Sequence, residues 1–292
     1  MNSPTQQHLL VIGASSLVGR RLREIAPQFQ GSVQFTGNTK LTPGDLKLDA
    51  YAPELFSPVS PIAAVIFCAP ISRLNEALLQ RLQKAGMKRL VVFSSTSILT
   101  KITSNDAAER LMLEQLKAGE ELVRSFCAQS AISWTIFRPT MIYDEGRDKN
   151  VSQIMRVIRR FGFFPIAGKA QGLRRPVHAA DLAKAALDVL KKEACTNKIY
   201  VLSGGEELTY KQMVERIYSG MGRAPLILPM PLLLWRLGFL AKSFFTPRSG
   251  VNFEMARRMN KHMNFEHTEA SSDFGYSPRA FLPKFSASLP QA

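Results

Sequence analysis

The chain has 292 residues, 46% of them hydrophobic and 21% charged, a composition that is ordinary for a soluble globular protein and sufficient to bury a core without disulfide or metal staples. Its three cysteines, Cys68, Cys127 and Cys195, are far apart and form no CxxC pattern, which excludes a disulfide framework and a zinc site and predicts a reducing, cytoplasmic compartment. The formal net charge of +15 favours anionic partners, but the basic residues are scattered without a recognition helix or an aromatic RNA-binding motif, so we do not expect a nucleic-acid partner.

Short apolar runs alternate with helical patterns in the first half of the chain. The runs cover residues 8–14, 32–37, 63–69, 89–95 and 133–139, and helical spacing covers residues 17–26, 74–86 and 107–128. Strands separated by helices are typical of βαβ units, and continuous apolar runs fit parallel strands that are covered on both faces. We therefore predict an α/β fold with a doubly wound parallel sheet and helices on both faces.

The pattern changes after residue 140. A polar loop at 144–150 leads to a helical segment, an irregular stretch rich in Gly and Pro, a second helix and another strand at 197–204. A Thr-capped helix and a proline-rich apolar segment follow. These elements predict a smaller second lobe, and we expect some of them to belong to the first lobe, which contains the parallel sheet. The N-terminus has no basic segment before an apolar one, and no apolar run is long and uncharged enough to span a bilayer.

The first strand–helix junction, VIGASSLVGRRL, has small residues at a spacing of three. Gly13 permits a tight turn, a small residue at Ser16 lets the backbone approach a pyrophosphate, and Gly19 lets the helix pack closely on the sheet. The N-terminus of the helix then faces the phosphates. This pattern predicts a dinucleotide site, although an ordinary strand–turn–helix with small residues is the alternative.

The stretch GASSLVGRRL resembles the Gly-x-x-Gly-x-x-Gly turn of the extended and atypical short-chain dehydrogenase/reductases, the NAD-dependent epimerase/dehydratase superfamily. The resemblance implies a Rossmann domain over residues 1–165, to which 176–204 return, and a small C-terminal α+β substrate lobe over 166–175 and 205–292. It implies NADP or NAD as the cofactor, with Ser16 in place of the middle glycine and its hydroxyl on a phosphate oxygen. The cofactor contacts that it implies in and after the apolar runs are Gly13, Ser15, Ser16, Leu17, Val18, Gly19, Arg20, Cys68, Ala69, Pro70, Pro139 and Thr140.

The end of the second run bears on the choice between NAD and NADP. An acidic residue there would bind the ribose 2′-hydroxyl and select NAD, but FTGNTK contains none. Arg20, Asn38 and Lys40 lie near enough in the sequence to meet a 2′-phosphate, which favours NADP. Asp49 matches the family's aspartate that contacts the adenine amine, with a loop or helix-cap aspartate as the alternative.

A strip of residues in the fourth run and the following helix resembles the family's active site. After VVFSSTS, Thr96 matches the hydroxyl residue that polarises the substrate oxygen, with Ser95 beside it. Lys117 in LKAGEELV matches the lysine of Tyr-x-x-x-Lys, which binds the nicotinamide ribose and lowers the tyrosine's pKa. Leu113 stands where the tyrosine is expected, and leucine cannot exchange a proton. The alternative for Lys117 is an ordinary solvated helix lysine.

Three further matches lie beyond residue 140. Tyr143, in FRPTMIYDEG, resembles the tyrosine of Arg-Pro-x-x-x-Tyr-Gly and is a substitute proton donor or, more often in such motifs, a packing residue. In LRRPVHAADLA, Arg174 matches the arginine that grips a sugar-nucleotide diphosphate. His178 is interpreted as a structural histidine near the substrate, with a catalytic role as the alternative, and Asp181 as a helix cap.

The most apolar stretch, residues 225–247, is interrupted by Arg236 and Lys242. We interpret it as a helix that walls the substrate pocket; the alternatives are an interfacial helix over 229–245 that contacts anionic lipid at the inner membrane face, or a dimer surface. DFGYSPRAFLPKF (273–285) resembles the family's closing signature, so the resemblance covers nearly the whole chain.

These patterns leave two functional hypotheses open. In the first, the chain is an NADP-dependent oxidoreductase or nucleotide-sugar epimerase-like enzyme that acts on a small molecule without the usual tyrosine. In the second, it is a non-catalytic NADP(H)-binding sensor or accessory subunit, similar to the atypical members found in respiratory complex I. Thr96, Lys117 and Arg174 favour the first hypothesis, and Leu113 favours the second. We expect a monomer or homodimer.

Overall fold

The computed structural model describes residues 8–38, 42–49, 52–53, 61–102, 106–231 and 253–285. The chain divides into two compact units. Unit 1 comprises Met1–Thr140, Ala179–Leu202 and Glu266–Ser277, and unit 2 comprises Met141–His178, Ser203–Phe265 and Pro278–Ala292. Each unit is therefore built from segments that are distant in the sequence.

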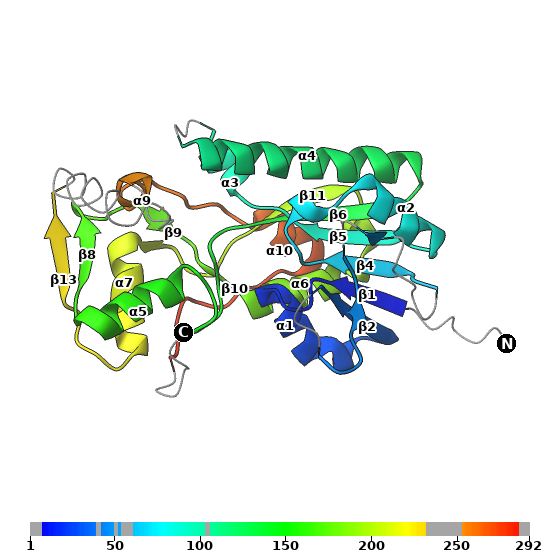
Figure 1. The fold of residues 1–292 in the computed structure, drawn as a ribbon. Coiled ribbons are helices and arrows are strands. Elements are labelled where there is room, and N and C mark those ends of the chain that lie inside the picture. Colours follow the sequence, from blue (N-terminus) through cyan, green and yellow to red (C-terminus); the bar gives the residue numbers. More distant parts are fainter. Residues whose placement is uncertain are drawn as a thin grey trace. The chain divides into compact units, whose positions relative to one another are not determined.

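A seven-stranded parallel sheet forms the centre of unit 1 (Figure 1). Its strands are β1 (His8–Ile12), β2 (Ser32–Gly37), β3 (Leu46–Lys47), β4 (Ala64–Phe67), β5 (Arg89–Phe93), β6 (Ser133–Pro139) and β11 (Lys198–Leu202). Their order is β11-β6-β5-β4-β1-β2-β3, and each pair of neighbours is parallel. This is the order of a doubly wound Rossmann sheet, so the predicted fold class is confirmed.

Helices cover both faces of this sheet (Figure 1). They are α1 (Leu17–Ile25), α2 (Glu76–Lys84), α3 (Ser97–Thr100), α4 (Ala107–Gln129), α6 (Ala179–Leu190) and α10 (Thr268–Phe274), with 3-10 turns at Ala26–Gln28, Ile71–Arg73 and Glu193–Cys195. Buried leucines of α2 and residues Val123 and Cys127 of α4 pack on alternate side chains of the central strands in one apolar core, while α1 packs against α6 on the other face. Burial on both faces explains the continuous apolar runs of the strands.

Unit 2 is built from short elements around a second apolar core. Its strands are β7 (Ile142–Tyr143), β8 (Phe164–Ala167), β9 (Leu173–Arg174), β10 (Val177–His178), β12 (Leu208–Thr209) and β13 (Ile227–Met230), and its helices are α5 (Val151–Phe161), α7 (Tyr210–Gly220) and α9 (Phe253–Arg258). The strands pair as β10–β7, β12–β9 and β13–β8, and α5 packs against α7. Thr209 caps α7 in a capping box with Gln212.

The compact units divide the chain at different residues from the sequence-based division. Residues 141–165, which the sequence places with the Rossmann domain, are in unit 2 because the apolar face of α5 packs into the core that contains Met213 and Ile217. Residues 266–277, which the sequence places in the lobe, are in unit 1. There the ring of Phe274 packs against the ring of Tyr200 on β11, with the ring centroids 5.3 Å apart.

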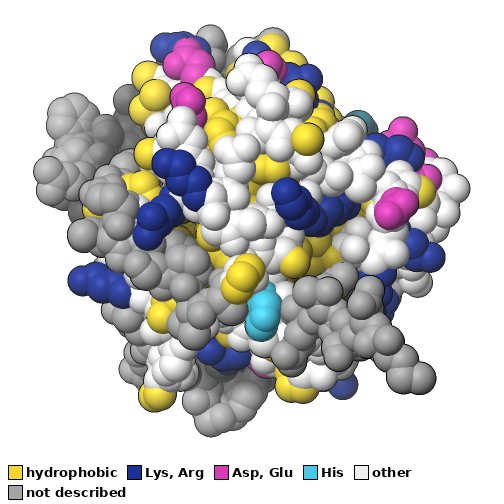
Figure 2. Space-filling view, turned by 90° about the vertical axis from the view of Figure 1, so that its right-hand side faces the viewer, with side chains coloured by type: hydrophobic (Ala, Val, Ile, Leu, Met, Phe, Trp, Pro, Cys, Tyr) yellow, Lys and Arg dark blue, Asp and Glu magenta, His cyan; other side chains and the backbone are white. Residues whose placement is uncertain are grey.

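Two expectations concern residues that the structure leaves undescribed. Lys40 lies outside the described residues, as does most of the 229–245 segment, of which only 229–231 are described. Among the described residues, no helix is both long and apolar enough to cross a membrane. On the face shown in Figure 2, Lys and Arg side chains are dispersed among uncharged ones rather than gathered in one patch.

Two backbone approaches at the start of α1 require glycine. Gly13 has a φ of +88°, and a Cβ there would lie 2.6 Å from the amide nitrogen of Ala69, which follows β4. A Cβ on Gly19 would lie 2.3 Å from the carbonyl oxygen of Gly13. Both neighbours are main-chain atoms, so the turn has no room for a side chain at either position.

Replacing Gly13 by alanine should therefore destabilise the protein more than positive φ alone explains. Gly44 is a matched control, because its φ is +89° and its Cβ would meet nothing within 4 Å. We expect Gly44→Ala to cost about 1 kcal/mol from left-handed strain and Gly13→Ala about 3 kcal/mol, because overpacking adds to that strain. Urea unfolding measures both, and equal losses would contradict the close approach at Gly13.

Candidate functional site

The carboxyl ends of β1 and β4 mark the point where the strand order of the sheet reverses. Ligands of doubly wound sheets bind at such a switch point, outside the carboxyl ends of the strands. The turn after β1 and the segment from Cys68 to Pro70 after β4 meet here through the contact between Gly13 and Ala69. Cys68 is buried, and burial raises the pKa of its thiol, so this cysteine contributes a neutral, apolar wall.

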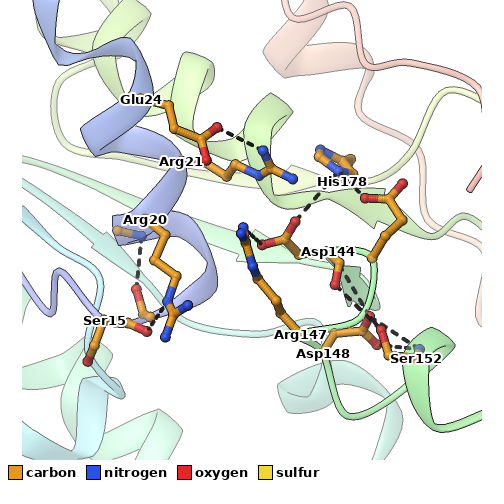
Figure 3. Close-up of polar contacts among 12 residues, drawn as sticks. Ser15, Arg20, Arg21, Glu24, Asp144, Arg147, Asp148, Ser152 and His178 are labelled. Atoms are coloured by element: carbon orange, nitrogen blue, oxygen red, sulfur yellow. Dashed lines mark hydrogen bonds and ion pairs between the residues drawn. The ribbon is translucent and has the colours of Figure 1, made fainter. Parts of the chain in front are cut away.

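The turn after β1 presents the N-terminus of α1. The Ser16 hydroxyl accepts a hydrogen bond from the amide of Gly19 at 2.9 Å and caps the helix, so the predicted phosphate ligand is first of all an N-cap. A hydroxyl that accepts at its oxygen still has its own proton to donate, and the cap therefore remains compatible with phosphate. The Arg20 side chain turns back to the same segment, where its Nε donates to the Ser15 carbonyl at 3.1 Å (Figure 3).

The end of β2 carries no acidic side chain. Thr36 and Gly37 are buried, and the exposed Asn38 follows them; the Thr36 carbonyl accepts hydrogen bonds from the amides of Gly13 and Ala14 at 3.2 and 3.0 Å. The acid of the next loop, Asp45, pairs with Arg23, whose Nη2 lies 2.7 and 2.8 Å from the two carboxylate oxygens. That carboxylate is bound to a guanidinium and to the Thr42 amide.

Asp49 lies two residues beyond β3 and is half-buried. Its carbonyl oxygen accepts a hydrogen bond from the Ala52 amide at 3.2 Å. This position in a loop suits either of the two interpretations, the adenine contact or the loop aspartate, and the adenine contact stays a prediction.

Hydroxyl residues follow β5, as the sequence predicts. Thr96 is buried and uses both its amide and its hydroxyl to donate to the Pro139 carbonyl, at 3.0 and 3.1 Å. Because its proton is engaged there, Thr96 in this arrangement ties the ends of β5 and β6 together rather than donating to a substrate. Ser95 accepts from the Ser97 amide at 3.1 Å, and its proton is not used in that bond. Ser95 therefore suits the role of substrate-oxygen donor better than Thr96.

A buried ion pair fixes α4 to the ends of β5 and β6. Glu120 is 3% exposed and binds Arg138 in bidentate geometry, with Nε to Oε1 at 2.9 Å and Nη2 to Oε2 at 2.5 Å. The Ser94 hydroxyl donates to the same carboxylate at 2.5 Å. The sequence patterns did not lead us to predict this network. The feature that indicates it is an acid on the apolar face of α4, three residues before the buried Val123.

The anchor at Glu120 locates Lys117 and Leu113. Ser94 directly follows β5, so the turns of α4 that precede Glu120 run beyond the carboxyl ends of the strands, where a cofactor of this fold binds. Leu113 is buried in this part of the helix, whereas Lys117 is exposed. Leu113 thus places a buried apolar side chain, which cannot exchange a proton, one helical turn before the exposed Lys117.

Of the matches beyond residue 140, Asp181 lies in the first turn of α6 in unit 1, and the others belong to unit 2. Tyr143 is 1% exposed and packs edge-on against the rings of His178 and Phe281, with centroids 5.0 and 4.9 Å apart. This burial supports the packing interpretation over the proton donor. The His178 Nε2 lies 3.0 Å from Glu145 Oε2 and 4.0 Å from Asp144 Oδ1 (Figure 3).

The ligand atoms of Asp144, Glu145 and His178 lie within 4.8 Å of one another, a spacing that a cation could bridge. A carboxylate–imidazole hydrogen bond accounts for the same arrangement without a metal. Asp148 extends the network, because its carboxylate accepts from the amides of Asn150 and Ser152 at the start of α5 (Figure 3). The network thus joins the β7–α5 loop to β10 and supports the structural interpretation of His178.

Arg174 has its guanidinium bound within unit 2. Nη1 donates to the carbonyls of Leu173 and Lys261 at 2.7 and 2.6 Å, and Nη2 donates to the carbonyl of Arg258. The residue is 4% exposed, and burial lowers the pKa of Arg174 to about 10. These contacts make Arg174 a link between β9 and the segment after α9, and a role in gripping a diphosphate would require those donors to be released.

Residues 71–203 match the family model described as the NAD dependent epimerase/dehydratase family. The sequence is 29% identical over 139 residues, 47% of this chain, to an Arabidopsis thaliana protein named NADH dehydrogenase [ubiquinone] 1 alpha subcomplex subunit 9, mitochondrial. It is 23% identical over 163 residues, 52% of this chain, to UDP-glucose 4-epimerase of Vibrio cholerae. The matched parts span 49% of the epimerase and 32% of the Arabidopsis protein. The predicted relationship to the epimerase/dehydratase superfamily is confirmed.

Solved structures share the fold over nearly the whole chain. MoeE5 in complex with UDP-glucose and NAD has a TM-score of 0.68 and 19% identity, with 94% of both chains covered. RMD from Pseudomonas aeruginosa complexed with NADPH has a TM-score of 0.66 and 16% identity, with 95% of both chains covered. The neighbours thus include both an NAD and an NADPH complex.

The Glu120–Arg138 pair should contribute strongly to stability. Glu120→Gln leaves a largely buried guanidinium without its charge partner, and we expect a loss of about 3 kcal/mol in the free energy of unfolding. The neighbouring Glu121, 64% exposed and paired with Arg124, is the matched control; Glu121→Gln should change stability by less than about 0.5 kcal/mol. Urea unfolding of both variants measures the difference, and equal stabilities would rule out the anchoring role of Glu120.

Proposed function

We propose that this relative of the NAD dependent epimerase/dehydratase family binds a nicotinamide dinucleotide in unit 1, with NADP preferred over NAD. The observation that carries the proposal is the glycine turn at the switch point of the sheet. A Cβ at Gly13 or Gly19 would strike main-chain atoms, and the turn leads directly into the capped N-terminus of α1. Amides at a helix N-terminus bind phosphate through their N–H groups and the helix dipole.

The preference for NADP rests on charge at the ends of β1 and β2. The residues at the end of β2 and just after it, Thr36, Gly37 and Asn38, are not acidic, and the carboxylate of Asp45 is already bound to Arg23. Arg20 is exposed on the first turns of α1 and supplies a guanidinium suited to a 2′-phosphate. We assign Arg20 and Asn38 to the binding of the ribose 2′-phosphate. Lys40, Asp49 and the residues after β4 and β6 remain in the predicted cofactor set.

We infer that cofactor binding rather than catalysis is the better supported activity. A bound nicotinamide supplies hydride chemistry, and the chain must supply the proton. Leu113 carries no proton, Tyr143 is enclosed by aromatic rings in unit 2, and the Thr96 hydroxyl donates to Pro139. The non-catalytic hypothesis, a sensor or accessory subunit that retains NADP(H), follows from these three positions. Similarity to a subunit of NADH dehydrogenase is consistent with it.

An NADP-dependent oxidoreductase or epimerase-like enzyme is the second candidate function. Lys117 on α4 and Ser95 after β5 favour it, because a lysine that binds the ribose and a hydroxyl that donates to the substrate oxygen would remain. UDP-sugars are the substrate class that the names of the relatives suggest. Peripheral membrane contact and a monomeric or homodimeric state remain predictions.

Titration with NADPH and NADH, followed by nucleotide fluorescence, tests the proposed binding and its preference. We expect tighter binding of NADPH and a loss of roughly tenfold in NADPH affinity for Arg20→Ala, because a charge-assisted hydrogen bond is removed, with NADH affinity unchanged. Arg21→Ala is the control, since the adjacent Arg21 pairs with Glu24 at 2.7 Å (Figure 3). Absence of binding by either nucleotide would overturn the proposal, and an equal effect of both variants would remove Arg20 from the site.

Leu113→Tyr tests what the missing side chain does. A tyrosine at 113 lies one helical turn before Lys117 on the same side of α4, so we expect turnover of NADPH with UDP-sugars, aldehydes or quinones to rise at least about tenfold over the wild type. Leu116→Tyr, a half-buried position three residues later, should give no gain. Wild-type turnover as fast as that of Leu113→Tyr would instead support the enzyme hypothesis.

A further inference from the structure

The outer face of the β8–β13 pair is apolar and exposed. In register, Phe164 lies opposite Ile227, and Leu228 lies opposite Pro165. Phe164 is buried in the core of unit 2 with Ile227 packed against the same cluster. Because side chains alternate along a strand, Leu226, Leu228 and Pro165 point to the opposite face. Leu226 is 54% exposed and Leu228 is 41% exposed, so the described residues do not fully cover this face.

An exposed aromatic side chain lies at the end of α5, next to the segment that contains Leu226. Phe161 is 57% exposed, and the Tyr218 hydroxyl holds the two segments together through the carbonyls of Gly162 and Leu226, at 3.4 and 2.7 Å. The Phe164 amide also donates to the Leu226 carbonyl at 3.0 Å. Phe161, Leu226 and Leu228 therefore gather on adjoining segments, and we call these three residues the Phe161 patch.

The charges around the patch are of one sign. Residues 149–180 contain seven Lys and Arg and no Asp or Glu, and the charged residues of 217–231 are limited to Arg223. The pairing of β8 with β13 brings these two acid-free stretches side by side (Figure 1). Arg160 lies over the Phe161 ring at 5.4 Å, and Arg156 and Arg223 are exposed. An apolar patch is thus bordered by cations that no nearby acid in these stretches neutralises.

We propose that the Phe161 patch docks unit 2 onto an anionic lipid surface. Exposed aromatic and aliphatic side chains interleaved with arginine are the composition of interfacial membrane contacts, because the apolar groups enter the headgroup boundary while the cations remain with the lipid phosphates. A nucleic acid would use the arginines but gain little from exposed leucines. A second copy of the chain would set like charges against each other. The patch consists of unit 2 residues and the proposed dinucleotide site of unit 1 residues, so the proposal does not depend on whether a cofactor is bound or turned over.

Flotation of the full chain with vesicles tests the proposal. We expect co-flotation with vesicles of equal parts phosphatidylcholine and phosphatidylglycerol, weak co-flotation with pure phosphatidylcholine, and release by high salt, which screens the charges. Phe161→Ser combined with Leu228→Ser should lower the fraction bound by roughly tenfold. Arg160→Glu should lower it by more than about fivefold, because each cation near an anionic leaflet contributes about that factor.

Two matched variants separate the patch from general effects of charge and hydrophobicity. Leu111→Ser alters a leucine of α4 that is 55% exposed, and Arg124→Glu alters an exposed arginine of the same helix; both should bind vesicles like the wild type. Circular dichroism and urea unfolding should be unchanged in all four variants, which shows that they are folded whether or not NADPH binds. The proposal would be overturned if the patch variants floated like the wild type, or if the control variants lost as much binding. It would also be overturned if the patch variants changed only the self-association of the protein, measured by sedimentation, and not its binding to vesicles.

Discussion

The contact between main-chain atoms at Gly13 and Ala69 is the constraint on which unit 1 depends. It brings the turn after β1 against the end of β4, where the sheet reverses its order. The same turn donates two amides to the Thr36 carbonyl at the end of β2, so three strand ends share one closely packed junction. Gly19 then allows α1 to begin directly above the turn, and the helix N-terminus is aimed at the switch point. A phosphate site follows from this geometry before any side chain is considered.

The second anchor, Glu120 with Arg138, explains how α4 can keep its position while losing its usual chemistry. The ion pair and the Ser94 hydroxyl hold the helix against the ends of β5 and β6, and the apolar face of the helix packs on the sheet. None of these interactions requires a tyrosine at 113. A leucine there adds to the core instead, which is why stability and the loss of the proton donor are compatible in this chain.

Three buried or partly buried polar side chains of unit 2 have their partners within the unit. Arg174 binds three carbonyls, His178 faces two carboxylates, and Asp148 caps the start of α5. These hydrogen bonds stabilise a small core with little regular sheet, because a buried donor or acceptor left without a partner would cost free energy. Positive charge of unit 2 is instead found on α5, which carries three arginines and no acid, and the nearby Leu226 and Leu228 are exposed.

The sequence by itself determined the Rossmann sheet, the glycine turn, the lack of an acid after β2 and the absence of tyrosine at 113, because each depends on local pattern: continuous apolar runs, small residues at a spacing of three, or one residue's identity. The same motifs also predicted the relationship to the epimerase/dehydratase family. Only the tertiary structure decided that Ser16 caps α1, that Thr96 is tied to Pro139, that Glu120 rather than Glu121 is the buried acid, and that Arg174 and Tyr143 are enclosed in unit 2. These outcomes depend on which donors and acceptors meet across distant segments, and residue type and spacing along the chain carry no information about that meeting.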